Sequence, residues 1–126
     1  ARKFLREELN VGLGSDVAAG STENLFRAMA HAVQASKLRW RLTDESLAPL
    51  TVEEVFYMAT KGGGRFFGQV GGFEPGYEFD ALVLDGSRLS HPQALDVRSR
   101  LERMIYLADE REIQAKYVKG IEIDLS

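Results

Sequence analysis

Asp16 is the residue whose type and position are best suited to chemistry. It comes directly after the short apolar run 11–14 and just before the small residues at 18–20. A short apolar run is typical of a buried strand, and groups at the carboxyl end of such a strand face a ligand crevice. A carboxylate there can bind a cation or carry a proton, but Asp is also a common turn or capping residue. The pattern alone leaves both interpretations open.

The other residue types that could bind a ligand have ordinary structural explanations. Glycines 62–64 follow an expected helix and are not followed by Gly-Lys-Ser/Thr, so they predict a helix C-cap rather than a phosphate-binding loop. His31 is expected in a helix, in the core or at an interface, and His91 in a solvent-facing loop. Two histidines this far apart, without any cysteine, argue against a self-contained metal site.

The elements expected around Asp16 form a helix–strand–helix unit. Apolar residues one turn apart predict a helix over 1–9, and the run 11–14 predicts a buried strand. A second helix is expected over 24–40, with hydroxyl caps supplied at 21–22. Such a unit is the repeating element of parallel α/β folds, in which chemistry gathers at the carboxyl ends of the strands.

The remaining elements are expected to form a helical and then a β-rich portion. They are a helix from the capping box Thr51-x-x-Glu54 to the glycines, a type II turn at 74–77, a strand over 79–84, a helix over 95–108, and a hairpin of 113–118 and 121–123 about Lys119-Gly120.

The composition narrows the class of protein. The 126 residues carry a formal net charge of −3 and no cysteine. This balance gives no basic patch for nucleic acid or an anionic membrane, and the absence of cysteine rules out disulfides and a thiol nucleophile. The N-terminus lacks the apolar centre of a signal peptide, and no apolar run is long enough to span a bilayer. We therefore expect a soluble, cytoplasmic protein with no nucleic-acid or membrane partner.

Several segments resemble a known enzyme superfamily. The run Val11-Gly-Leu-Gly-Ser-Asp16-Val-Ala-Ala-Gly20, followed by 24–29 and 36–38, resembles the last strand and helix of the metal-dependent (β/α)₈ barrel of amidohydrolases. The likeness continues downstream with the C-terminal portion of guanine deaminases. The matching segments are LTVEEVFYMATKGG (50–63), GFEPGYEFDA (72–81) and LERMIYLADER (101–111).

The resemblance implies an α/β fold class. Residues 1–68 would be the terminal βα unit of a metal-dependent (β/α)₈ barrel with the helix that follows it. Residues 69–126 would supply the C-terminal strands and helix of a small β-sandwich. Because a complete barrel needs about 250 residues, we expect the chain to be incomplete as a stand-alone barrel and to be a piece of a longer protein.

The resemblance carries over one catalytic and metal-binding residue, Asp16. It matches the aspartate of the last barrel strand, which binds or abuts the zinc ion and shuttles protons in that family. There, zinc acidifies water, the aspartate takes its proton, and the hydroxide attacks the ring carbon that bears the amino group. Guanine would become xanthine with release of ammonia. The family's His-x-His pair, its two further histidine ligands and its glutamate are expected before Ala1, so the chain alone should bind no catalytic zinc and be inactive.

The partner implied for the parent enzyme is a purine base, and a homo-oligomer is expected. As a fragment, the chain should expose the apolar faces of 11–14 and 24–40 and associate through them. Three other interpretations stay open: a small α/β binding or interaction module in which Asp16 caps a turn, a structural subdomain that assembles with a complementary fragment, and another amidohydrolase such as a triazine chlorohydrolase or an adenosine-type deaminase.

Overall fold

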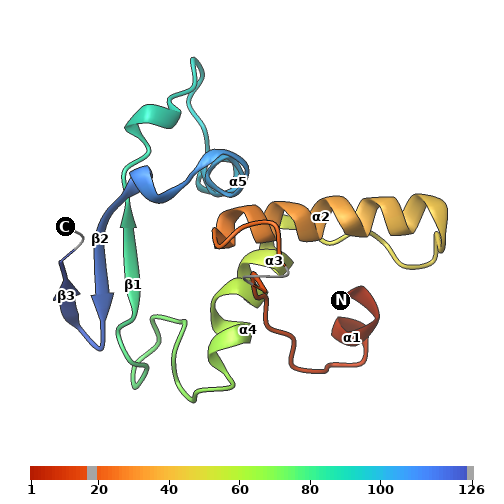
Figure 1. Cartoon of the computed structure of the whole chain (residues 1–126), viewed down its shortest axis with the longest axis horizontal. Coiled ribbons are helices and arrows are strands. Elements are labelled where there is room, and N and C mark those ends of the chain that lie inside the picture. The colour runs from red at the N-terminus through yellow and green to blue at the C-terminus, as the bar shows by residue number, and fades with distance from the viewer. Residues whose placement is uncertain (17–19, 125–126) are drawn as a thin grey trace.

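The structure is a computed structural model that describes residues 1–16 and 20–124. Its helices gather beside a three-stranded sheet (Figure 1). The helices are α1 (Arg2–Arg6), α2 (Leu25–Leu42), α3 (Val52–Ala59), α4 (Lys61–Gly64) and α5 (Val97–Leu107), and the strands are β1 (Ala81–Leu84), β2 (Ile113–Val118) and β3 (Ile121–Ile123). No helix in these described ranges combines the length and the apolar character needed to cross a bilayer.

Helix α2 confirms the helix predicted over 24–40. Its N-cap is Asn24, whose side chain accepts hydrogen bonds from the backbone N–H groups of Phe26 at 2.8 Å and Arg27 at 3.3 Å. These bonds satisfy donors that have no partner within the helix. At the other end, the indole of Trp40, the single tryptophan, donates to the carbonyl of Glu45 at 3.0 Å. The hydroxyl caps expected at 21–22 are wrong, since the cap is Asn24; the Thr22 hydroxyl instead accepts from the backbone N–H of Asn24 at 3.0 Å.

Helix α3 begins with the capping box predicted from Thr51 and Glu54. The Thr51 hydroxyl accepts from the Glu54 N–H, and the Glu54 carboxylate accepts from the Thr51 N–H. The same carboxylate forms a two-pronged ion pair with Arg2 of α1, whose guanidinium also donates to the carbonyls of Ala48 and Pro49. Arg2 therefore ties the N-terminal helix to the start of α3.

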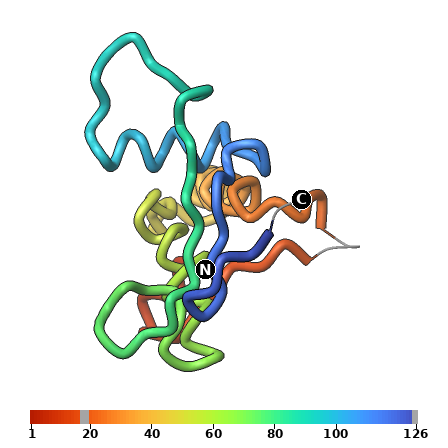
Figure 2. The backbone as a smooth tube through the Cα atoms, turned by 90° about the vertical axis from the view of Figure 1, so that its left-hand side faces the viewer, coloured from red at the N-terminus to blue at the C-terminus, as the bar shows by residue number. Residues whose placement is uncertain are grey.

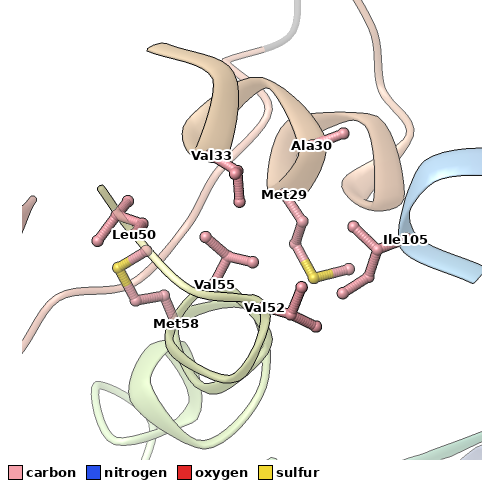
Figure 3. Close-up of a cluster of buried hydrophobic side chains, with 8 residues drawn as sticks. All are labelled: Met29, Ala30, Val33, Leu50, Val52, Val55, Met58 and Ile105. Carbon is pink, nitrogen blue, oxygen red and sulfur yellow. The ribbon is translucent and has the colours of Figure 1, made fainter. Parts of the chain in front are cut away.

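The apolar core lies between α2, α3 and α5 (Figure 3). Helical spacing places the apolar positions of each helix on one face, and these faces meet. The buried cluster consists of Met29, Ala30, Val33, Leu50, Val52, Val55, Met58 and Ile105.

The sheet is antiparallel with strand order β1-β2-β3. Ala81 pairs with Tyr117, and Val118 pairs with Ile121 across the predicted turn. Lys119 and Gly120 both have positive φ, as a two-residue hairpin turn requires. The strand predicted over 79–84, the hairpin and the helix predicted over 95–108 are thus confirmed.

The connection from β1 to α5 projects away from the helices and the sheet (Figure 2). The Arg103 side chain of α5 donates to the carbonyls of Leu89 at 2.7 Å and Ser90 at 3.1 Å. These bonds fasten the loop to the helix that follows it. His91 lies exposed in this loop, as predicted.

Three local predictions are wrong. Residues 11–14 form no strand, because a strand exists only with a hydrogen-bonded partner and no described strand pairs with them. The described sheet contains only the predicted strand and hairpin of the C-terminal part and is antiparallel, so it holds no strand of the expected parallel unit. The N-terminal helix stops at Arg6, well short of the predicted end at residue 9. Glycines 62–64 do not cap α3, which ends at Ala59, but form the short helix α4.

Candidate functional site

Asp16 lies exposed at the end of segment 11–16. Its φ of +51° is in the left-handed region, which non-glycine residues seldom adopt and Asp tolerates better than most. Its backbone carbonyl accepts a hydrogen bond from the N–H of Gly20. Within the described part of the chain, no hydrogen bond or ion pair reaches its carboxylate. The acid is therefore accessible to a group from outside these residues.

The core positions the segment that leads to Asp16. Val11 and Leu13 are half-buried and pack against the core cluster. The Leu13 N–H donates to the carbonyl of Met58 at 2.9 Å, where α3 ends. Asp16 thus stands three residues beyond a point that the last turn of α3 holds in place.

An open hollow of about 750 Å³ lies beside this segment. Its lining is mostly apolar side chains and glycine backbone, with one hydroxyl and no titratable side chain. The lining residues are Gly12, Leu13, Gly14, Ala59, Thr60, Gly63, Gly64, Phe66 and Phe67. The hollow therefore offers shape and apolar surface but no group for acid–base chemistry or for metal binding.

The described residues do not make up a zinc site. A catalytic zinc ion takes three protein ligands and an open position. In the ranges that the structure describes, no group of three or more His, Cys, Asp or Glu side chains comes together. His31 lies exposed on α2, so the prediction that placed it in the core or at an interface is wrong as regards the core. Asp16 supplies one carboxylate ligand, which is too few to hold a zinc ion without ligands from elsewhere.

Lys61, which follows Thr60 of the hollow, forms an ion pair with Glu74. Their hydrogen bond raises the pKa of Lys61 and lowers the pKa of Glu74, so both groups stay charged. The Lys61 ammonium also lies 5.4 Å from the centre of the Tyr77 ring, a cation–π contact. These contacts fasten the loop after α4 and leave Lys61 paired rather than free for catalysis.

Sequence reasoning missed the close approach of Gly12 to α4. A Cβ added at Gly12 would lie 3.0 Å from the Cα of Gly63, so the two backbones pass almost in contact. The only signal in the sequence is that both positions are glycine. Local patterns cannot show which glycines meet across about 50 residues of chain, and the triplet at 62–64 therefore suggested a helix end.

Comparisons with known proteins agree at both the sequence and the fold level. The sequence model of the Amidohydrolase family matches residues 1–122. Guanine deaminase from Dictyostelium discoideum is 30% identical over 129 residues, which cover 97% of this chain and 28% of the relative. Guanine deaminase from Homo sapiens is 33% identical over 134 residues, which cover 96% of this chain and 29% of the relative.

Two solved structures share the fold of this chain. The crystal structure of guanine deaminase from C. acetobutylicum, with guanine bound in the active site, is 51% identical with a TM-score of 0.91. The E. coli guanine deaminase structure is 28% identical with a TM-score of 0.83. In both cases the match covers 98% of this chain and 29% of the other. The chain thus spans less than a third of the length of these relatives, and the resemblance inferred from its sequence is confirmed.

Proposed function

The chain belongs to the amidohydrolase family, and from this premise we propose that it is the C-terminal part of an enzyme that hydrolyses guanine to xanthine and ammonia. One observation carries the proposal. Nearly the whole chain superposes, at 51% identity, on a guanine deaminase that holds guanine in its active site. The similar curated proteins from eukaryotes and bacteria are also guanine deaminases, which supports the same substrate.

The proposed arrangement divides the chain into two parts. Residues 1–68 would complete a (β/α)₈ barrel. The run 11–14, which is no strand in this chain, would become its last strand by pairing with a strand of the parent, and α2 would be the helix after it. Residues 69–126 would contribute β1, α5, β2 and β3 to a small β-sandwich. The lack of a strand partner for 11–16 among the described residues supports this division, because a strand in the parent barrel would supply it.

Within this arrangement we assign Asp16 the role of proton carrier beside the metal. Zinc, when bound by the complete enzyme, supplies acidified water at the site. The Asp16 carboxylate is exposed and no described group engages it, so it can accept a proton and return it to the departing ammonia. It can also provide one oxygen ligand, while the remaining ligands would come from parts of the enzyme outside this chain.

The test is ammonia release from guanine by the full-length protein. The wild type should produce xanthine and ammonia in equal amounts, and Asp16→Asn should lower kcat by about 100-fold or more. Glu23→Gln is the matched control, since Glu23 is another exposed carboxylate close by in the chain and should keep wild-type turnover. Near-wild-type turnover in Asp16→Asn would remove Asp16 from the mechanism.

Two parallel assays address the other substrates of related enzymes. Guanine should be turned over in preference to an adenosine-type substrate and to a chlorinated triazine, and preference for either of these would overturn the guanine assignment. Residues 1–126 on their own should release no ammonia, because they supply one candidate ligand. A cytoplasmic location and a homo-oligomeric state are further parts of the proposal for the parent, and size-exclusion chromatography with light scattering tests the latter.

A further inference from the structure

The three glycines at 62–64 have a use that neither the fold nor the proposed reaction explains. Two of them face segment 11–16, which runs beside α3 and α4 (Figure 1). A Cβ added at Gly62 would lie 2.9 Å from the carbonyl oxygen of Val11. A Cβ added at Gly12 would lie 3.0 Å from the Cα of Gly63. A side chain at Gly12 would therefore press the segment against α4. A side chain at Gly62 would press against Val11 and also against the ring and the carbonyl of Tyr57, each 3.0 Å from the added Cβ.

The end of α3 supplies the hydrogen bond that fixes the register of the segment. The last carbonyls of a helix have no partner within it. At this helix end the Phe56 carbonyl accepts from the Thr60 hydroxyl and the Tyr57 carbonyl from the Thr60 N–H. The Met58 carbonyl accepts from the Leu13 N–H at 2.9 Å. A displacement of the segment from α4 would lengthen or break this bond.

The support behind this contact is rigid. Val55 is fully buried, and Met58 is 1% exposed. The start of α3 is held by its capping box and by the ion pair between Glu54 and Arg2. The α3 end and α4 therefore form a fixed corner. Segment 11–16 lies against it through the backbone of Val11, Gly12 and Leu13, and the side chains of Val11 and Leu13 also pack on the core cluster.

We propose that this corner is the positioning element for Asp16, with Gly12 and Gly62 as positioning residues and the Met58 carbonyl as the anchor. The proposal rests on the proposed function, because it assigns Asp16 a catalytic role. Asp16 follows Leu13 by three residues, so an outward shift of the segment moves the carboxylate away from the reacting atoms. Misplacement by about 1 Å is enough to lower a rate by about 100-fold.

The experiment compares two glycine variants of the full-length protein that enlarge the same contact from opposite sides. Gly12→Ala and Gly62→Ala should each lower kcat for guanine by about tenfold to 100-fold, with KM within about twofold of wild type. The amide of Leu13 should exchange its hydrogen about tenfold faster in both variants. Asp16→Asn should leave this exchange unchanged, because it removes the acid without touching the contact.

The matched control is Gly120→Ala. It places the same methyl group at a glycine with a φ of +77° and no neighbour within 4 Å of the added Cβ. It should lower the melting temperature by straining the hairpin, yet keep kcat within about twofold of wild type and Leu13 exchange unchanged. Equal losses of kcat in Gly120→Ala and in the two contact variants would overturn the positioning role, and so would unchanged kcat in both contact variants.

The wild type alone provides a decisive measurement if the contact variants do not fold. Its Leu13 amide should be protected from exchange to the same degree as amides of α3. Free exchange at Leu13 would overturn the proposal. Wild-type protein that releases no ammonia from guanine would instead overturn the proposed function, and the exchange data would then decide separately whether the corner holds the segment.

Discussion

Helices α2, α3 and α5 enclose an apolar core, whereas the strands of the sheet bury none of their side chains to a comparable degree. Val55 and Met58 are almost completely inaccessible. By contrast, β2 alternates between half-buried and exposed positions, and every residue of β3 is exposed. The two regions therefore depend on different forces, apolar burial in one and backbone pairing in the other.

The sheet gains what stability it has from its ladder, its turn and a few aromatic contacts. Phe79 lies between Phe73 and Tyr117, with ring centres 5.9 Å and 5.6 Å apart. Five aliphatic side chains on the strands remain exposed: Leu82, Val83, Val118, Ile121 and Ile123. A sheet of this kind is a layer whose apolar side chains have few partners within the described residues. The comparison predicts that substitutions in the helical core cost much more than substitutions on the strands.

The largest difference should appear between two truncations to alanine. Met58→Ala removes a side chain that is 1% exposed and should lower the free energy of unfolding by about 2–5 kcal/mol. Leu82→Ala in β1, where the side chain is 48% exposed, should cost less than about 1 kcal/mol. Urea unfolding of both variants checks this, and equal losses would refute the contrast between the two regions.

The next largest effect concerns the tie between α1 and α3. Arg2→Ala removes the two-pronged pair with Glu54 and the bonds to two loop carbonyls, and should cost about 2 kcal/mol. Lys3→Ala is the control, because its pair with Glu7 spans 4.0 Å between exposed side chains. Exposed pairs of this kind contribute little, so its melting temperature should match that of the wild type. An equal loss of stability in Lys3→Ala would show that the hydrogen bonds of Arg2 contribute nothing specific to the free energy of unfolding.

A smaller effect, of opposite sign, is expected in the hairpin. Lys119→Asn should raise the free energy of unfolding by about 0.5 kcal/mol, because Asn tolerates the left-handed conformation at this turn position better than Lys. The bond from the backbone N–H of residue 119 to Asp80, at 2.8 Å, is retained. The exposed Lys119–Glu78 pair is lost at little cost. A decrease in the urea midpoint would show that this ion pair outweighs the turn geometry.

The smallest effect is a pH dependence at the junction between the two regions. Asp109 stands between α5 and β2, and hydrogen bonds from Arg111 hold its pKa well below the usual value of 3.8. A carboxyl with a depressed pKa stabilises the fold above its unfolded pKa, and this contribution is lost as the pH falls through the folded value. The urea concentration at the unfolding midpoint should therefore decrease as the pH is lowered below about 4. The urea midpoint of Asp109→Asn should decrease less steeply than that of the wild type as the pH is lowered through this range. The same decrease in both proteins would exclude a contribution from Asp109.

The sequence predicts those parts of the fold whose causes are local. The capping box at Thr51 and Glu54, the helical spacing of α2 and the turn at Lys119-Gly120 are each encoded within a few neighbouring residues. Their positions are accordingly confirmed to within a few residues. The type II turn is confirmed as well, by a φ of +92° at Gly76 and the bond from the Tyr77 N–H to the Glu74 carbonyl.

The parts that escape prediction depend on distant contacts. Segment 11–14 has the composition of a strand, but a strand requires a partner to complete its hydrogen bonds. The glycine triplet follows the rule for a helix end, yet it lies in the short helix α4, where it passes close to the distant residues Val11 and Gly12. The role of Asp16 was inferred from a family resemblance and stays a prediction, since its chemistry depends on groups that the described residues do not contain.

Trp40 offers a way to observe one half of the molecule at a time. As the single tryptophan, it sits in the last turn of α2, with its indole N–H bonded to the Glu45 carbonyl. Its fluorescence therefore reports on the helical layer and not on the strands, whose one aromatic residue in the described part of the chain is Tyr117. Tyr57 and Tyr106 lie on α3 and α5, so tyrosine emission would not isolate the sheet. Comparing tryptophan emission with hydrogen exchange at the amides of β2 during denaturation would reveal whether the two halves unfold together or in sequence.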